Sequence, residues 1–459
     1  MDAGDETPEK NIQDDFFKSF YKNCKKNNVI SIEDFEFYNV KRGLRNADGS
    51  GVVAGLTRIC NVHGYIIDEG DVCPVEGKLT YRGYDIYDLV NACIEENRHG
   101  FEETIYLLLT GELPTESQLE AFNSVLSDFR ELPDNFLEDV LIKNPSDNIM
   151  NMMARAILYL YAYDLNPEDE SMENILLQSI KIIAMMPTIM VNAYQVKRRQ
   201  YDNKSSYFHP PKTDHSMAES ILYALRPDRV FTAEEARLLD ICLILHADHG
   251  GGNNSSFAAR VLSSAGTDTY SAIAAALGSL KGTKHGGANA KVEEMIRYIK
   301  DGVSDWEDEA EITEFLEKIM KKEAGDGSGL IYGMGHAIYT LSDPRAVILR
   351  ENARSIAESK GMAAEFRLLE SIEKLAPEVF YKMKGRGKTI CANVDLYSGF
   401  VYRCLGIPSD LFTPIFAVAR VAGWCAHRIE EIYTGGRIIR PAYKSLSENP
   451  KYIPISKRK

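Results

Sequence analysis

The chain has 459 residues, enough for two or three domains, and 44% of them are hydrophobic, as expected for a globular protein with a large core. Its formal net charge is −14, which argues against nucleic-acid binding, because non-specific binding to phosphates needs an excess of basic residues. An acidic chain that binds an anionic substrate must gather its arginines at the site, so the positions of the arginines are informative.

The sequence predicts a cytoplasmic protein with free thiols. None of the eight cysteines forms a C-x-x-C pair. The N-terminal residues MDAGDETPEKNIQDDFFKSF are acidic and contain no apolar signal region. The longest apolar stretch, residues 175–191, is interrupted by Lys181 and Pro187, so we expect a core helix and no membrane span.

In chain order, residues 1–48 are polar and charged, with aromatic anchors between Phe16 and Tyr21, and predict one or two helices lying on the body. Residues 51–84 contain the runs GVVAGLTRICNVHGY and GKLTYRGYDI, which are broken by glycine and predict β-strands. From Asp85 onward the apolar residues recur at helical spacing. We therefore predict a mostly α fold with a small β region near residues 51–84.

Glycine-rich segments divide the helical part of the chain. They lie at residues 282–287, 325–335 and 385–387, and they bracket a segment that we predict to be a smaller, mobile domain. The predicted parts are an N-terminal polar helical extension, the first part of a large helical domain, the small mobile domain and the C-terminal part of the large domain, at residues 1–48, 49–286, 287–403 and 404–459.

Two histidine-containing motifs stand on glycine turns. The first, HADHGGGN at residues 246–253, contains His246, Asp248 and His249. The second, KGTKHGGAN, places His285 just before a helix predicted to begin near Ala288. The positive end of a helix disfavours imidazolium, so a neutral His285 can donate a hydrogen bond to a carbonyl oxygen that is becoming an enolate. The alternative is a helix-cap histidine.

Two further motifs carry a histidine, an arginine and an aspartate. GMGHAIYTLSDPRA sets His336 and Arg345 nine residues apart on glycine turns, with Arg345 in the first turn of a helix that Asp343 and Pro344 begin. NVDLYSG places Asp395 after an apolar run, where a carboxylate is either a helix cap or a base of raised pKa.

Arg420 is the most informative single residue, because it is the one charged side chain in the segment 411–426. Such a helix is buried on most sides, and a buried guanidinium must be paired. The partner is either an anionic ligand or an acid from elsewhere in the fold. Arg440, in RIIRPAY, is weaker evidence for an anionic ligand, because a surface residue before Pro441 explains it equally well.

This set of imidazoles, arginines and one aspartate suits proton abstraction next to a carbonyl group, performed on a polycarboxylate. The rival from another class is a metallohydrolase with a metal ion on His246, Asp248 and His249, which chelators would silence. No thiolate or glutamate cluster completes that ligand set. A third class, a non-catalytic binding protein, would be expected to lack Asp395 or His285.

Taken together, HADHGGGN, KGTKHGGAN, GMGHAIYTLSDPRA, NVDLYSG and the pair Arg420 and Arg440 resemble the citrate synthase family, which includes 2-methylcitrate synthase. The resemblance runs from about Tyr81 to Pro441. It implies an almost wholly helical homodimer whose protomers have a large and a small domain. It also implies an active site in the cleft between the domains, which closes on oxaloacetate.

The resemblance implies an acyltransferase of the tricarboxylic acid cycle that needs neither a metal nor a cofactor. Asp395 would remove a methyl proton from acetyl-CoA, His285 would stabilise the enol, and His336 would polarise the oxaloacetate carbonyl. Citryl-CoA would then be hydrolysed to citrate and CoA. The carboxylates of oxaloacetate would be held by His249, Arg345, Arg420 and, in the neighbouring protomer's site, Arg440. His246 would be a packing and hydrogen-bonding residue at a helix end.

The CoA contacts implied by the resemblance are Gly335, Arg386, Lys388 and Asn393. Many relatives carry a basic residue at the position of Thr340, so another Lys or Arg must meet the CoA phosphate here. The alternative substrate is propionyl-CoA, as used by 2-methylcitrate synthase. The extra methylene is worth only about 1–3 kcal/mol in an acyl pocket. We expect dimer contacts from apolar helices such as those at residues 151–163 or 240–245.

Overall fold

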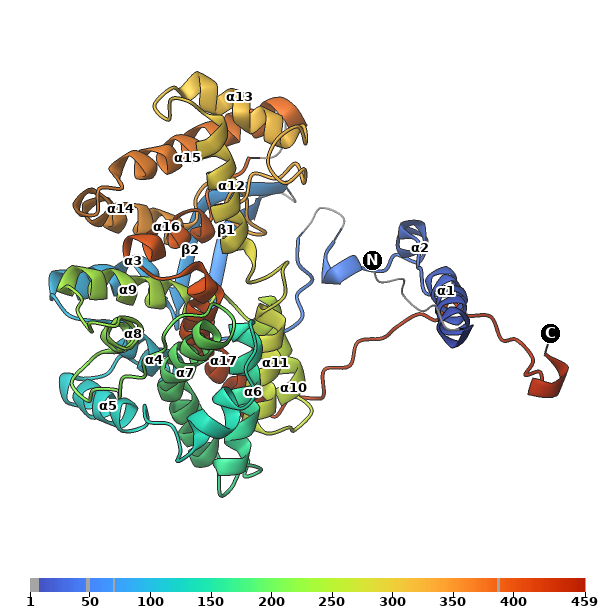
Figure 1. Ribbon diagram of the computed structural model, residues 1–459, viewed down its shortest axis with the longest axis horizontal. Coiled ribbons are helices and arrows are strands. Elements are labelled where there is room, and N and C mark those ends of the chain that lie inside the picture. The colour runs from blue at the N-terminus through green and yellow to red at the C-terminus, as the bar shows by residue number, and fades with distance from the viewer. Residues whose placement is uncertain (1–7, 47–49, 69–70, 386–388, 459) are drawn as a thin grey trace. The chain divides into compact units, whose positions relative to one another are not determined.

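The computed structural model describes residues 8–46, 50–68, 71–385 and 389–458. The chain forms two compact units, Met1–Ala54 and Gly55–Lys459. The first unit contains α1 (Pro8–Asn27), α2 (Ile32–Phe37) and the short 3₁₀ turn η1 (Arg42–Leu44), so the helical prediction for the N-terminus is confirmed (Figure 1). The side chain of Ser31 caps α2 by accepting from the backbone N–H of Asp34 at 3.1 Å.

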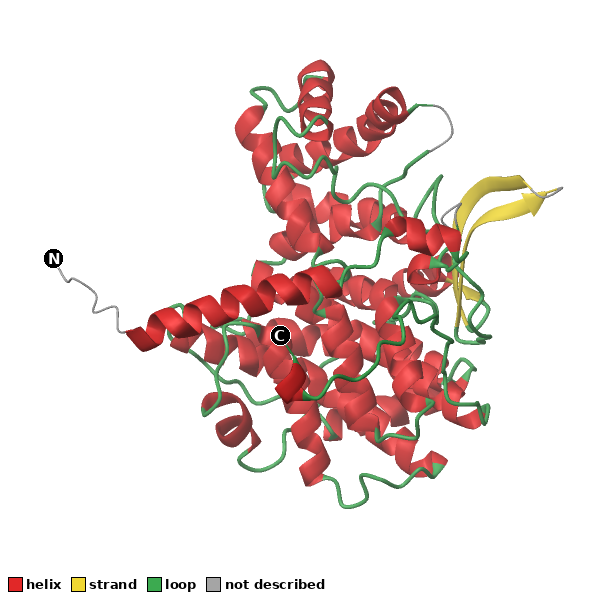
Figure 2. Ribbon diagram, turned by 90° about the vertical axis from the view of Figure 1, so that its right-hand side faces the viewer, coloured by secondary structure: helices red, strands yellow, loops and turns green. Residues whose placement is uncertain are grey.

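The second unit begins with a three-stranded antiparallel sheet, shown in yellow in Figure 2. Its strands β1 (Cys60–Asp68), β2 (Asp71–Tyr81) and β3 (Tyr84–Asp85) are neighbours in chain order. Cys60 pairs with Tyr81, and Leu79 and Tyr81 point into the core with no exposed surface. The β region near residues 51–84 is therefore confirmed.

The remaining elements of the second unit are helices, which confirms the mostly α fold. They are α3 (Ile86–Glu95), α4 (Phe101–Thr110), α5 (Glu116–Asp128), the π-helical η2 (Leu137–Ile142), α6 (Ile149–Leu160), η3 (Tyr161–Tyr163), α7 (Met172–Gln200), α8 (Met217–Leu225), α9 (Ala233–His246), α10 (Asn254–Ser263), α11 (Thr269–Leu280), α12 (Ala288–Gly302), α13 (Glu309–Met320), α14 (Pro344–Ser359), α15 (Ala363–Lys384), α16 (Val394–Cys404), η4 (Ser409–Leu411), α17 (Phe412–Tyr433) and η5 (Ile455–Lys457).

Helix α17 is the central element of this unit. It packs against α4, α7, α9, α10 and α11, and it is buried along almost its whole length (Figure 1). Helix α7 also lies in the core, against α6, α8 and α17. Among the described residues it is the one helix long and apolar enough to cross a membrane, and 67% of its most apolar stretch is buried inside the protein, as the prediction of a core helix requires.

Helices α12 to α16 form a group of their own, in the upper part of Figure 1. The pairs α12 and α16, α13 and α15, and α14 and α16 pack side by side. The glycine-rich segment 282–287 precedes this group in the chain, and the segment 325–335 lies within it, between α13 and α14. The prediction that these helices form a mobile domain with boundaries at residues 287 and 403 stays a prediction.

The β-hairpin packs closely on the loop that precedes α14. Gly64 and Gly77 leave room for that loop: a Cβ atom on Gly64 would lie 2.7 Å from the Ile338 carbonyl oxygen, and one on Gly77 would lie 2.1 Å from the Ser342 carbonyl oxygen. The Gly77 N–H also donates to Ser342 Oγ at 3.1 Å. On its other side, the hairpin is tied to α9 by Tyr81, whose hydroxyl oxygen lies 3.0 Å from the carbonyl oxygen of Ile244, in the last turn of that helix, and 3.1 Å from that of Asp248, just beyond it.

We predict that Gly77→Ala destabilises the protein by about 1–3 kcal/mol, because the new methyl group overlaps backbone that cannot move freely. The matched control is Gly55→Ala, because a Cβ atom on Gly55 would have no other atom within 4 Å, and there the change should stay within about 0.5 kcal/mol. Denaturant unfolding of both variants at one protein concentration measures the difference. Equal stabilities would show that the hairpin does not hold the loop.

Candidate active site

The imidazoles of two separate motifs meet at the end of α9. The His249 and His336 ring centroids lie 5.1 Å apart with perpendicular planes. Tyr339 stacks on His336 at 4.7 Å and contacts His249 edge-on at 5.6 Å. The structure therefore brings together two predicted site residues that are 87 positions apart in the sequence.

The backbone fixes the proton of His336. Its Nδ1 accepts from the N–H groups of Ile338 and Tyr339 at 3.1 and 3.2 Å. A ring nitrogen that accepts carries no proton, so the proton of the neutral ring is on Nε2. His336 can therefore donate from Nε2 to a carbonyl oxygen, which is the role predicted for it.

Arg345 is held at the first turn of α14. Its Nε and Nη2 donate to the two oxygens of Asp343 at 3.0 and 2.7 Å, and Asp343 also caps the helix. Burial disfavours the charged guanidinium, but the Asp343 carboxylate more than offsets this and raises the pKa of Arg345. The side chain is therefore a fixed cation inside the protein, 4% exposed.

Arg420 has no exposed surface, and only its Nε has a hydrogen-bond partner within the described chain. Nε donates to the His246 carbonyl oxygen at 2.6 Å, whereas Nη1 and Nη2 are buried without a partner. The guanidinium lies over the Phe416 ring, 4.6 Å from its centroid. Burial lowers the pKa of Arg420, and the Asp248 carboxylate partly opposes this. Such a group is suited to bind an anion.

His285 lies before α12 as predicted, and a residue that the sequence did not reveal orients it. The His285 Nε2 lies 3.0 Å from Ser255 Oγ, which also accepts from the Trp424 indole N–H at 3.1 Å and lies 2.9 Å from Asn253 Oδ1. Burial, followed by the charge of Arg420, lowers the pKa of His285 to about 4. The ring is therefore neutral at physiological pH and able to donate one hydrogen bond.

Asp395 is the second residue of α16, and the cap of that helix is Asn393, whose Oδ1 accepts from the Asp395 N–H at 3.0 Å. The helix-cap alternative for Asp395 is therefore wrong. Burial raises the pKa of Asp395 to about 6, although the charges of Arg345 and Arg420 act in the opposite direction. A carboxylate tuned in this way suits a general base near neutral pH.

Asp248 belongs to a second buried network. The His427 Nδ1 accepts from Arg260 at 2.8 Å, so its Nε2 carries the proton and donates to Asp248 Oδ2 at 3.2 Å. The same oxygen accepts from the Gly250 N–H at 2.9 Å. Although burial acts in the opposite direction, His427 and then Arg420 hold the pKa of Asp248 well below its usual range. Asp248 is therefore a buried anion close to Arg420.

The metal-site alternative has no geometric support in the described ranges, where no group of three His, Cys, Asp or Glu side chains is arranged to hold an ion. The ring of His246 packs on Phe416 with centroids 4.6 Å apart. The prediction that His246 packs at the end of α9 is met, but both of its ring nitrogens are buried without a hydrogen-bond partner in the part of the chain that the structure describes.

Of the four residues predicted to bind CoA, the structure describes Gly335 and Asn393, which contact each other. The Gly335 N–H donates to the Cys391 carbonyl oxygen at 2.7 Å, and the Gly335 carbonyl oxygen accepts from Asn393 Nδ2 at 2.8 Å. Asn393 thus holds the Gly335 loop as well as capping α16. Arg386 and Lys388 lie outside the described residues. Thr340 is half-buried and has no hydrogen-bond partner for Oγ1 among the residues described.

Arg440 is exposed and lies beyond α17, where the chain runs without helix or strand as far as η5 (Figure 1). The structure therefore does not bring it to the other site residues of the same chain. The preceding Ile439 is fastened to the body through its N–H, which donates to Ser264 Oγ at 3.0 Å.

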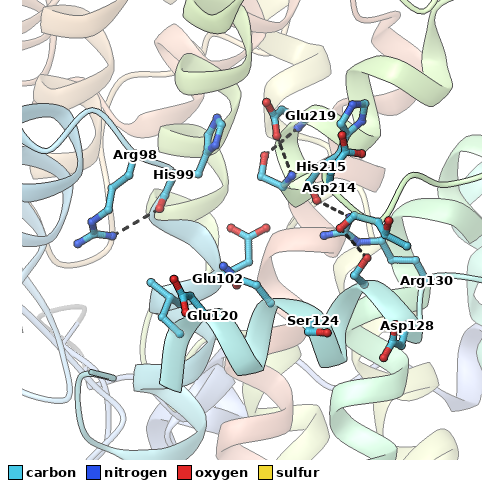
Figure 3. Close-up of a pocket in the computed structure, with 15 residues that line it drawn as sticks. Arg98, His99, Glu102, Glu120, Ser124, Asp128, Arg130, Asp214, His215 and Glu219 are labelled. Atoms are coloured by element: carbon cyan, nitrogen blue, oxygen red, sulfur yellow. Dashed lines mark hydrogen bonds between the residues drawn. The ribbon is translucent and has the colours of Figure 1, made fainter. Parts of the chain in front are cut away.

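A cavity of about 540 Å³ lies apart from the predicted site, between α4, α5 and the start of α8 (Figure 3). Glu102 and Arg130 are its most buried charged side chains, at 4% and 3% exposure. None of the predicted catalytic residues lines it. Its lining mixes acids with arginines and histidines, and the chemistry described above is not located there.

The predicted site thus combines two fixed guanidinium groups, neutral imidazoles and one carboxylate of raised pKa. The charge of Arg420 influences the pKa of His249, of His285 and of Asp395. Burial, followed by Arg345, keeps the pKa of His249 well below its ordinary value. This arrangement can bind a carboxylate and move a proton beside it.

The comparisons agree with this chemistry. The family model described as "Citrate synthase, C-terminal domain" matches residues 47–442. The citrate synthase of Haloferax volcanii is 34% identical over 427 residues, which cover 91% of this chain and 99% of that protein. The 2-methylcitrate synthase 1 of Corynebacterium glutamicum is 32% identical over 423 residues, covering 91% and 98%.

Comparison with solved structures indicates the same family. The crystal structure of citrate synthase from Thermotoga maritima superposes with a TM-score of 0.70 at 32% identity, covering 89% of this chain and 98% of that one. A ternary complex of carboxymethyl coenzyme A and oxaloacetate with citrate synthase from Thermoplasma acidophilum gives a TM-score of 0.71 at 28% identity, covering 89% and 97%. The matched region contains every described site residue, and the chain belongs to the citrate synthase family of acyltransferases.

Proposed function

We propose that the protein condenses acetyl-CoA with oxaloacetate and hydrolyses citryl-CoA to citrate and CoA. The observation that carries this proposal is the buried guanidinium of Arg420, whose Nη1 and Nη2 have no partner among the described residues. A cation left unpaired in the core needs an anionic ligand, and a dicarboxylate satisfies Arg420 and Arg345 together.

Oxaloacetate binds first in this mechanism. Its carboxylates are held by Arg420, Arg345 and His249. The bidentate pair with Asp343 occupies Nε and Nη2 of Arg345, which leaves Nη1 for a carboxylate oxygen. The proton on His336 Nε2 is donated to the ketone oxygen and makes the ketone carbon more electrophilic.

Enolisation of the acyl group follows. Asp395 accepts a proton from the methyl carbon of acetyl-CoA, and its raised pKa makes the carboxylate a stronger base. To donate to the thioester oxygen, the neutral ring of His285 carries its proton on Nδ1. The Ser255 hydroxyl group then donates to His285 Nε2 instead of to Asn253 Oδ1. The enol carbon then attacks the ketone carbon, and water cleaves the resulting thioester. The mechanism as proposed requires no cofactor or metal.

A second candidate is the 2-methylcitrate synthase reaction with propionyl-CoA. It is favoured by relatives of that name, including the protein of Shewanella oneidensis, which is 35% identical over 383 residues. The same catalytic groups serve both reactions, so the choice rests on the pocket for one additional methyl group.

We further propose that the protein is a cytoplasmic homodimer in which Arg440 reaches the neighbouring protomer's site. The exposure of Arg440 beyond α17 is compatible with such a reach. Of the two helices expected to form the dimer contact, residues 240–245 are wholly buried within the chain, so that expectation is wrong. Helix α6 keeps Leu158 and Tyr159 at 48% and 50% exposure and is the better candidate.

The first test is thiol release by the purified protein with oxaloacetate and EDTA, with acetyl-CoA and propionyl-CoA offered in parallel. We expect release with acetyl-CoA, and the ratio of the two kcat/KM values decides between the two candidates. Release in EDTA also separates this chemistry from a metallohydrolase. No release with either acyl-CoA would overturn the proposed condensation.

Asp395→Asn should lose turnover by several orders of magnitude while still binding oxaloacetate, because the base and the carboxylate ligands are separate groups. In the wild-type enzyme, kcat/KM should fall as the pH drops through about 6, where Asp395 becomes protonated. Near wild-type turnover of the variant would remove Asp395 from the mechanism.

The same variant should be more stable than the wild type. The folded-state pKa of Asp395 is raised from 3.8 to about 6, so the side chain stabilises the fold below pH 3.8, and this contribution is lost as the pH rises through 6. Asn avoids the cost of a buried ionised carboxylate, and the gain above pH 6 is roughly 3 kcal/mol. Denaturant unfolding of both proteins at pH 7.5 and pH 4 measures this gain in the free energy of unfolding. An equal gain at both pH values would contradict the raised pKa of Asp395.

Arg420→Leu should weaken oxaloacetate binding by about 2–5 kcal/mol, because the carboxylate loses a buried charged donor. The fold should survive, since an apolar side chain suits the surroundings of α17. Calorimetric titration with oxaloacetate measures the affinity, and Arg237→Leu, on the exposed side of α9, is a control for loss of one positive charge. Unchanged affinity would return Arg420 to a purely structural role.

A further inference from the structure

Two buried polar side chains link the helices next to the catalytic groups. Helix α12 begins three residues after His285, and Asp395 is the second residue of α16. Between these helices, Asn289 Nδ2 donates to Ser398 Oγ at 2.7 Å. Asn289 is 6% exposed and Ser398 is fully buried, so water does not compete for this hydrogen bond.

The two helices approach closely at this point because Ser398 is followed by a glycine. A Cβ atom on Gly399 would lie 2.6 Å from Asn289 Oδ1 and 2.8 Å from Glu293 Oε1. One turn farther along α12, Glu293 Oε2 pairs with Arg403 Nε at 2.7 Å. The hydrogen bond between Asn289 and Ser398 therefore links the two helices near their N-terminal ends, and the ion pair between Glu293 and Arg403 links them farther along.

His285 is attached to a different part of the protein. Its ring contacts Ser255 on α10. The next residue, Gly286, donates to the Leu280 carbonyl oxygen at 2.9 Å and accepts from Thr413 Oγ1 at 2.7 Å. The chain then passes through Gly287 into α12. The pair Gly286 and Gly287 thus separates the anchored His285 from the helix that carries Asn289.

We propose that Asn289 and Ser398 are positioning residues for proton abstraction. Their hydrogen bond makes α12 and α16 move as one body, so the placement of α12 relative to His285 also places Asp395. Enolisation needs the Asp395 carboxylate at the methyl C–H and the His285 donor at the thioester oxygen at the same moment. This inference rests on the proposed condensation and explains why two polar side chains outside the catalytic set are buried between these helices.

The test compares Ser398→Ala, Asn289→Ala and the double variant with the wild type, using acetyl-CoA with a normal or a trideuterated methyl group. A base displaced by about 1 Å costs roughly 100-fold in rate, so we expect kcat to fall about 10- to 100-fold. The deuterium isotope effect on kcat should rise, because proton abstraction becomes slower than the later steps. Oxaloacetate affinity should stay within about twofold, since Arg345 and Arg420 are untouched, and the double variant should be no worse than the poorer single variant.

Glu293→Gln is the matched control, because it weakens the second link between the same helices. It should lower the thermal midpoint without raising the isotope effect. If Asn289→Ala does not fold, the comparison of Ser398→Ala with Glu293→Gln decides alone. If the wild type is active and Ser398→Ala and Glu293→Gln show the same isotope effect, the inference is overturned. If the wild type releases no thiol, the proposed function is overturned as well.

Discussion

Arg420 holds its positive charge within α17, a helix that is buried along almost its whole length, and neighbouring groups are arranged around that buried charge. Its Nε bonds to the last carbonyl of α9, its face lies on Phe416, and Asp248 supplies a buried negative charge nearby. These contacts leave two nitrogens unsatisfied within the described chain. Since an unpaired buried cation is costly, the surroundings of Arg420 are specific for an anion before any ligand arrives.

One face of α17 organises the groups around that charge. Gly423, one turn after Arg420, gives Asp248 room to approach, because a Cβ there would lie 2.4 Å from Asp248 Oδ1. Trp424 bonds to Ser255, which contacts His285, and His427 bonds to Asp248. A single helix therefore aligns the Arg420 guanidinium, the His285 imidazole and the buried Asp248 carboxylate, so a shift of α17 would disturb all three at once.

The sequence singled out His285, His336 and Asp395 as candidate catalytic residues, because they stand on glycine turns and helix starts with distinctive local patterns. It did not predict Ser255 or His427, whose partners are 30 and 179 positions away and whose residue types are common in cores. Apolar periodicity also misplaced a dimer contact at residues 240–245, since the same pattern describes a helix buried on all sides. Pairings across the fold need the tertiary structure.

The two guanidinium nitrogens of Arg420 that have no partner in the described chain also bear on how long the protein persists. A dicarboxylate that binds only the folded form shifts the folding equilibrium by mass action, by about 2.7 kcal/mol at one hundred times its Kd. Proteases act on the opened chain, so the same shift lowers the fraction open to cleavage about 100-fold. Abundance would then follow the supply of substrate, and starvation for the dicarboxylate would shorten the lifetime of the protein without any dedicated regulator.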